Sequence, residues 1–241
     1  MTLSTASPSW RITLHRILVR IAIGMFVLVC LTYVCECAIE WHRRERLEAI
    51  VQSVKTLQVG VTTDDEVRAL SERYKGRFTS EGTFTEPRTS TYSISFSSPY
   101  VRGSDGFHTL PGRRVWFATV ELTIKERRLE QEWVQFVVPR SDGVLLVHAV
   151  QVASHDFQGE NYVIFEPHTN SGTPSEGFNV YLTPKATPAE HATAFRFNLS
   201  CLTALRECRH PCDFVPEVWH ELRLLHPGER GDSMDADCRA R

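Results

Sequence analysis

The sequence lacks an excess of basic charge and the composition of a disordered or multi-span membrane protein. Its 241 residues include 27 basic and 29 acidic side chains, and from residue 47 onward there are 21 basic and 26 acidic residues. A nucleic-acid-binding domain needs a basic face that displaces phosphate counterions, so we expect no nucleic-acid partner. With 42% hydrophobic and 23% charged residues, the chain has the composition of a globular protein with a sizeable core.

The common catalytic motifs are also absent, among them Gly-x-Ser-x-Gly, His-Glu-x-x-His and the P-loop. There is no Cys-x-x-Cys, so no motif indicates a thioredoxin-like redox role. Five histidines show no metal-ligand spacing and are expected at the surface or as satisfied polar residues: His108, His148, His155, His168 and His191. We therefore expect a protein that is not an enzyme, with no catalytic residue, cofactor or metal.

What the sequence does contain is one long apolar run near its start, at residues 17–35, in which Arg20 is the only charged residue. The charge-free part, residues 21–35, would rise about 22 Å as a helix, which is short for a hydrocarbon core of about 30 Å. A span must therefore include Arg20, whose guanidinium can reach back to the interface. We predict a transmembrane helix over residues 17–37, preceded by a short tail at 1–16, with the lipid bilayer as a partner.

Two other interpretations of this run are a cleaved signal peptide and the core helix of a soluble protein. Cleavage would have to fall after Cys37, at a Cys-Glu-Cys sequence that is a poor signal-peptidase site, so we favour an uncleaved signal-anchor. The arginines on the two flanks of the run are equal in number, three on each side. The short N-terminal flank favours an N-terminus inside the cell, with the bulk of the chain outside the cytoplasm.

A pair of juxtamembrane helices is predicted at residues 38–76. Residues 42–58 carry an apolar stripe at helical spacing, and Gly60 is a suitable stop. A second helix opens at Thr63, where Thr63 and Glu66 have the spacing of a capping box.

The start of this second helix carries a resemblance to a known family. Residues 57–67 read LQVGVTTDDEV, which together with Leu70 is similar to the L-x-V-G-x-[ST]-x-x-E-V-x-x-L helix-start pattern of BamE/SmpA-like envelope proteins. The whole layout, including FRFNLSCL at residues 195–202, resembles uncharacterised single-pass membrane proteins of acidobacterial type. The resemblance implies an envelope location and a helix pair on a sheet. The chain has no lipidated cysteine and is longer than the small lipoproteins, so a role in barrel assembly is not carried over.

From residue 91 the apolar period changes from 3.6 to 2, which predicts strands joined by turns. The expected strands are at residues 92–96, 116–124, 134–138, 144–152, 162–165, 178–182 and 194–199. Because no long helices separate them, we expect an antiparallel sheet, and the fold class is α+β. This β-rich domain is assigned to residues 77–226 with a C-terminal helix near 215–222, and residues 227–241 are expected to be a disordered tail.

One cluster of residues could carry chemistry: Cys201, Cys208, His210 and Cys212. Thiolates and an imidazole could hold zinc, but the paired Cys-x2-Cys spacing of zinc sites is missing. A disulfide is the simpler interpretation in an oxidising compartment. Cys201–Cys208 is the first choice and Cys208–Cys212 the alternative. In a continuous helix the Cα atoms of Cys201 and Cys208 would lie about 10 Å apart, so the first choice requires a turn between them.

These observations lead to two functional interpretations. The first is a non-enzymatic binding or scaffold domain, anchored in the membrane by one helix, whose possible partner is another envelope protein. The alternative is a metal- or thiol-dependent hydrolase that uses Cys208, His210 and Cys212.

Overall fold

The computed structural model describes residues 8–81, 89–98, 115–140, 143–154, 159–165, 175–203, 208 and 210–218. The chain divides into two compact units, Met1–His42 and Arg43–Arg241, and each is described by itself below. The tail expected at residues 227–241 lies outside the described residues.

The first unit consists of most of helix α1 (Pro8–Val54), a continuous helix of 47 residues. It is long and apolar enough to cross a membrane, as the run at residues 17–35 predicts. The helix begins at Pro8, upstream of the expected start at residue 17. Its large apolar side chains are exposed rather than packed against protein, for example Phe26 at 69% and Leu28 at 62% exposure.

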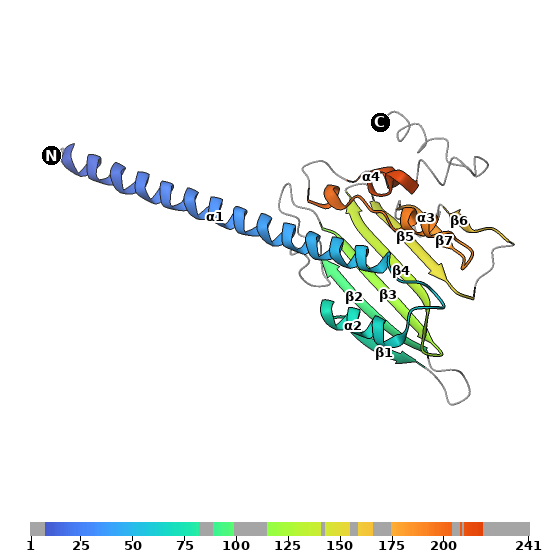
Figure 1. Cartoon of the computed structure of the whole chain (residues 1–241). Helices are drawn as coiled ribbons and strands as arrows, with labels where there is room; N and C mark the ends of the chain where they lie inside the picture. Colours follow the sequence, from blue (N-terminus) through green and yellow to red (C-terminus); the bar gives the residue numbers. More distant parts are fainter. Residues whose placement is uncertain are drawn as a thin grey trace. The chain divides into compact units, whose positions relative to one another are not determined.

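The second unit is built on a seven-stranded sheet with the strand order β1-β2-β3-β4-β5-β7-β6 (Figure 1). The strands are β1 (Arg77–Glu81), β2 (Thr89–Ser97), β3 (Phe117–Lys125), β4 (Arg128–Arg140), β5 (Gly143–Val152), β6 (Tyr162–Phe165) and β7 (Ser175–Leu182). The expectation of a wholly antiparallel sheet is wrong for one pair, because β7 runs parallel to β5. After β5 the chain forms β6, the outermost strand on that side of the sheet. It then turns back as β7, which lies between β5 and β6 and pairs antiparallel with β6.

Alternation along the strands places one set of side chains in the core, as the period of 2 predicts. In β3 the inward residues Ala118, Val120 and Leu122 are at most 1% exposed. The hairpin from β3 to β4 is tighter than the gap between the expected strands at residues 116–124 and 134–138, because Glu126 and Arg127 alone make the turn. Both have positive φ, 53° and 64°, which is the conformation that a two-residue hairpin needs.

The helices of the second unit lie on one face of the sheet, and their apolar side chains share one core with the inward side chains of the strands (Figure 1). The last turns of α1 contribute Leu47, Ile50 and Val54, which are all fully buried, and α2 (Asp64–Tyr74) contributes Val67 and Leu70. This is the expected helix pair on a sheet, except that its first helix is the end of α1. The short helices α3 (Pro188–Ala194), η1 (Leu199–Leu202) and α4 (Pro211–Phe214) complete the layer.

The sequence-based assignment is wrong at residues 194–199, where a strand was expected. Ala194 ends α3, and Leu199 begins the 3-10 helix η1. The apolar residues there alternate over too short a stretch to distinguish a strand from the junction of two helices. The C-terminal helix also begins earlier than expected, at Pro211, and is interrupted at Val215. The part of that prediction beyond residue 218 lies outside the described residues.

Helix α2 begins as its sequence predicts, at the pair Thr63 and Glu66. The Glu66 carboxylate accepts hydrogen bonds from both the backbone N–H and the hydroxyl of Thr63, at 2.8 Å each. These bonds favour the charged carboxylate, so they lower the pKa of Glu66. The preceding turn is fixed to the sheet, because Gly60 N–H donates to the carbonyl of Leu129 (2.7 Å) and Leu129 N–H donates to that of Thr62 (2.8 Å). Gly60 has φ +79°, a conformation that favours glycine.

Replacing Thr63 by alanine should lower the free energy of unfolding of the second unit by about 1 kcal/mol, since the helix loses its N-cap side chain. Thr63→Asp should be nearly neutral because aspartate is an equally good cap. Urea denaturation of a chain that begins at Arg43 measures both changes. An alanine variant as stable as the parent would show that the Thr63 side chain does not stabilise the start of α2.

Candidate functional site

The cysteine cluster is the first candidate site, and the structure joins Cys201 to Cys208 by a disulfide with the Cα atoms 5.3 Å apart. The turn that this bridge requires is present, because η1 ends at Leu202 and the chain leaves it through Thr203. The alternative pairing, Cys208–Cys212, does not form, and Cys212 is itself disulfide-bonded. Neither Cys208 nor Cys212 therefore has a thiol to offer as a nucleophile or metal ligand.

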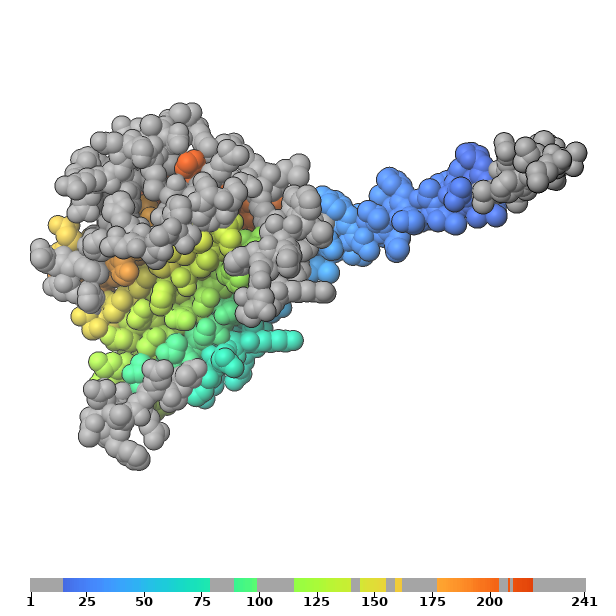
Figure 2. Space-filling model, turned by 180° about the vertical axis from the view of Figure 1, so that it is seen from behind, coloured from blue at the N-terminus to red at the C-terminus, as the bar shows by residue number. Residues whose placement is uncertain are grey.

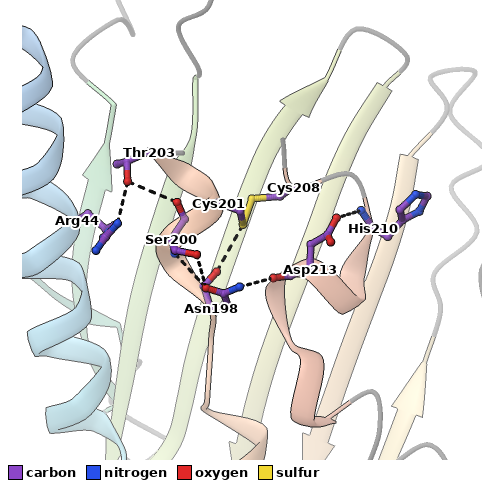
Figure 3. Close-up of a disulfide and its surroundings, with 8 residues drawn as sticks. All are labelled: Arg44, Asn198, Ser200, Cys201, Thr203, Cys208, His210 and Asp213. Carbon is purple, nitrogen blue, oxygen red and sulfur yellow. Dashed lines mark hydrogen bonds between the residues drawn. A yellow bond between two sulfur atoms is a disulfide. The ribbon is translucent and has the colours of Figure 1, made fainter. Parts of the chain in front are cut away.

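The segments around this disulfide are tied together by hydrogen bonds (Figure 3). The side-chain amide nitrogen of Asn198 (Nδ2) donates to the backbone carbonyl of Asp213 at 3.1 Å. The side-chain oxygen of Asn198 (Oδ1) accepts a hydrogen bond from the Ser200 hydroxyl at 2.6 Å. The His210 backbone N–H donates to the Asp213 carboxylate at 3.2 Å. These contacts fix η1 against α4. Within the described part of the chain, no three His, Cys, Asp or Glu side chains are placed to share a metal ion.

A second polar centre, which sequence reasoning missed, is a buried pair between β4 and α3. Glu132 is fully buried on the helix-covered face of β4, and its carboxylate is hydrogen-bonded to Nε2 of His191, whose side chain is 8% exposed. Burial raises the pKa of Glu132, and the hydrogen bond with His191 opposes that rise. The His191 ring also packs on Phe195, with the ring centroids 4.7 Å apart.

The Glu132–His191 pair has the chemistry of a catalytic dyad, since carboxylates orient histidines in many hydrolases. Its burial indicates another role. Both side chains are closed off from solvent, so a substrate cannot reach them in this conformation. The pair instead gives α3 a polar attachment to the sheet, and Gln151, the neighbour of Glu132 on β5, adds a bond from its side-chain amide to the Thr183 carbonyl at 3.1 Å.

A signal for this pair is present in the sequence. Thr187 and Glu190 have the same capping-box spacing as Thr63 and Glu66, with Pro188 at the first helical position. The Glu190 carboxylate accepts from the Thr187 backbone N–H at 2.7 Å. A helix that begins there places His191 one turn from its start, where a histidine on the inner face needs a buried partner.

The third candidate is the outer face of the sheet, opposite the helices. Its central strands lie uncovered in the view from behind (Figure 2). Rows of polar side chains from β2 and β3 lie opposite one another, in the pairs Thr91–Thr123, Ser93–Glu121 and Ser95–Thr119; Ser95 is exposed and the others are half-buried. The hydroxyls of Thr91 and Thr123 are 3.5 Å apart. This part of the face offers hydroxyl and carboxylate groups for hydrogen bonding.

Toward β5 and β7 the outer face becomes more aromatic. The rings of Trp133 and His148 meet edge to face, with their centroids 5.6 Å apart, and His148 lies opposite Asn179 in the parallel β5–β7 pair. Trp133 Nε1, His148 Nε2 and Asn179 Oδ1 are buried and have no hydrogen-bond partner among the described residues. Burial lowers the pKa of His148, so the imidazole is neutral at pH 7. The histidine is half-buried rather than at the surface.

No protein-family model, curated protein or solved structure matches the chain. The similarity to BamE/SmpA-like envelope proteins and to acidobacterial single-pass proteins therefore stays a prediction from the sequence.

Replacing Glu132 by glutamine should change how stability depends on pH. The raised pKa means that the folded protein holds the Glu132 proton more tightly than the unfolded chain, whose glutamate pKa is about 4.3. The stability linked to this proton is complete below about pH 4.3 and is lost as the pH rises through the folded-state value. Glu132→Gln cannot undergo this loss, so the unfolding free energy of the parent should fall relative to that of the variant as the pH rises.

Urea denaturation between pH 4.5 and 7.5 measures this difference. Glu130→Gln, on the same strand at a half-exposed position, is the matched control and should follow the parent at every pH. If the unfolding free energies of the parent and of Glu132→Gln change in parallel with pH, burial does not raise the pKa of Glu132.

Proposed function

We propose that the protein is a single-pass membrane-anchored envelope protein whose sheet domain lies outside the cytoplasm and binds another envelope protein without catalysing a reaction. The observation that carries the proposal is that one chain combines an exposed apolar helix with a domain that contains a disulfide. Each half of this combination restricts the environment of a different part of the chain.

The apolar helix supports the membrane anchor. Its side chains Ile23, Phe26 and Leu28 are each more than half exposed in the first unit. Apolar surface in water costs roughly 25 cal/mol per Å², so a helix exposed along its length is stable in a lipid environment. Arg20 lies near the N-terminal end of the apolar run at residues 17–35, where a long side chain reaches the interface.

The disulfide supports the orientation. Structural disulfides persist in oxidising compartments and are rare in the cytosol. Cys201 and Cys208 are joined, whereas Cys30 and Cys35 in α1 are free thiols. This distribution fits a sheet domain outside the cytoplasm and an N-terminus inside, which is the arrangement of a signal-anchor.

The polar groups of the domain support binding rather than catalysis. Glu132 and His191 are closed to solvent, and Cys208 is part of a disulfide, so a hydrolase that uses Cys208, His210 and Cys212 has no thiolate available. The outer sheet face, in contrast, offers hydroxyl side chains on β2 and β3 beside the Trp133–His148 pair. A face that combines aromatic and hydrogen-bonding side chains suits a protein partner.

The test is photo-crosslinking of the full-length protein in its native membranes. A photoreactive phenylalanine analogue at position 119, in the middle of the outer face, should give a discrete product heavier than the chain by the mass of one partner. The same analogue at Ala189, an exposed position on α3, is the control and should give none. Ser95→Arg, opposite position 119 in the sheet, should abolish the product.

Two results would contradict the proposal. One is a position 119 that gives no product in native membranes. The other is an identical product from positions 119 and 189, since that would indicate random collision rather than a bound partner.

A further inference from the structure

The outer face of the sheet carries a carboxylate beside an aromatic ring, at the pair Glu121 and Trp133. The two residues lie directly opposite each other in the antiparallel β3–β4 ladder, so they share one face, while Val120 and Leu122 point into the core. Both side chains are half-buried, and the space-filling view shows β3 and β4 on this face (Figure 2). Opposite residues in such a ladder have Cβ atoms about 4.5–5.5 Å apart, so one bound group can touch both side chains.

The Glu121 carboxylate has no ion pair or hydrogen bond with any described residue. The side-chain amides of Gln131 and Gln135, which flank Trp133 along β4, are also without a hydrogen-bond partner among the described residues. The nearest basic residue on β3 is Lys125, four positions away, or about 13 Å along an extended strand. A half-buried carboxylate attracts a cation more strongly than a fully solvated one does, because the local dielectric is lower.

The Trp133 ring has a neutral neighbour on its other side. On β5 the His148 ring meets it edge to face, with the centroids 5.6 Å apart, so His148 and Glu121 lie on opposite sides of β4. Burial lowers the pKa of His148, so this imidazole adds no positive charge at pH 7. The face of an indole attracts cations through its quadrupole, and here no charge on His148 opposes that attraction.

We propose, on the basis of the proposed function, that this face recognises an arginine of the partner protein, whose guanidinium lies on the Trp133 ring and forms a bidentate ion pair with Glu121. Arginine fits both groups at once, because its guanidinium is planar, always charged and presents paired N–H donors that match a carboxylate. A lysine ammonium is a compact point charge and lacks this geometry. The amide oxygens of Gln131 and Gln135 are available to accept the remaining N–H groups of the guanidinium.

The first test uses N-acetyl-arginine amide as the probe and the full-length chain in detergent, labelled with fluorotryptophan. The chain has five tryptophans, so the fluorine NMR resonance of Trp133 is identified by its loss in Trp133→Phe. The probe should shift this resonance in a saturable way. Glu121→Gln should weaken binding about tenfold, as expected for the loss of a charge-assisted hydrogen bond. Glu126→Gln removes a carboxylate from the exposed β3–β4 turn and is the matched control, which should bind like the parent.

A neutral probe tests the requirement for charge. N-acetyl-citrulline amide has nearly the same shape as the arginine probe but carries no charge, so it should leave the Trp133 resonance unshifted. Equal binding of the two probes, equal binding of the arginine probe by the parent and by Glu121→Gln, or a parent without a saturable shift would each overturn the arginine site.

Cross-linking from position 119 separates this inference from the proposed function. In native membranes Glu121→Gln should lower the yield of the cross-linked product about tenfold, and Glu126→Gln should leave the yield unchanged. An undiminished product in Glu121→Gln overturns the arginine contact, although the protein partner itself is then real. Binding of the arginine probe by a parent that gives no cross-linked product contradicts the protein partner and still supports a guanidinium site at Glu121 and Trp133.

Discussion

Burial of the end of α1 in the core of the sheet domain is the interaction on which the rest of this structure depends. Leu47, Ile50 and Val54 are completely buried, and each such side chain contributes roughly 1.5–3 kcal/mol. Polar contacts reinforce it, because Arg43 donates to the Ser97 carbonyl at 2.6 Å and Arg44 donates to the Thr203 hydroxyl at 2.9 Å. The helix that supplies the apolar segment therefore also contributes its last turns to the core of the domain.

This arrangement explains the asymmetry of the sheet. One face is occupied by helical segments from both ends of the chain, while the described outer face carries the hydroxyl rows of β2 and β3. Buried polar groups occur on both faces. On the inner side, one carboxylate oxygen of Glu132 is hydrogen-bonded to His191, which attaches a short helix, while its other oxygen, Oε2, is buried without a hydrogen-bond partner among the described residues. Trp133 Nε1 and Asn179 Oδ1, which also have no partner among the described residues, are on the outer side, where the binding role is proposed.

Much of this fold could be predicted from local patterns. The period of 2 identified the core of β3, and the Thr63–Glu66 spacing located the start of α2, because these features depend on residues close together in the chain. From the sequence, a disulfide between Cys201 and Cys208 could be preferred to one between Cys208 and Cys212. The spacing of the cysteines alone could not decide between these two pairings. The capping pair Thr187–Glu190 has the same form as Thr63–Glu66 and could have predicted α3.

The features that could not be predicted depend on contacts between distant parts of the chain. The parallel pairing of β5 with β7 depends on the path that the chain takes between the two strands. The sequence of β7 itself does not indicate this path. Strand β1 is short and has little alternation, so its pairing with β2 determines its conformation. The partnership of Glu132 with His191 joins residues 59 positions apart. The burial of Glu132 cannot be recognised from the alternation along β4. It becomes clear only when the helix that covers this strand is known.

We propose a membrane-resident chain that carries an oxidised domain outside the cytoplasm. The direct measurement is thiol trapping in intact cells, followed by carbonate washing of the membranes and peptide mass spectrometry of the full-length protein. We expect the chain to stay in the membrane with its N-terminal region intact. Cys201 and Cys208 should be unmodified until reduction, and Cys30 and Cys35 should react as free thiols under denaturing conditions. Free thiols at Cys201 and Cys208, or recovery in the soluble fraction of a chain that lacks the first 37 residues, would contradict it.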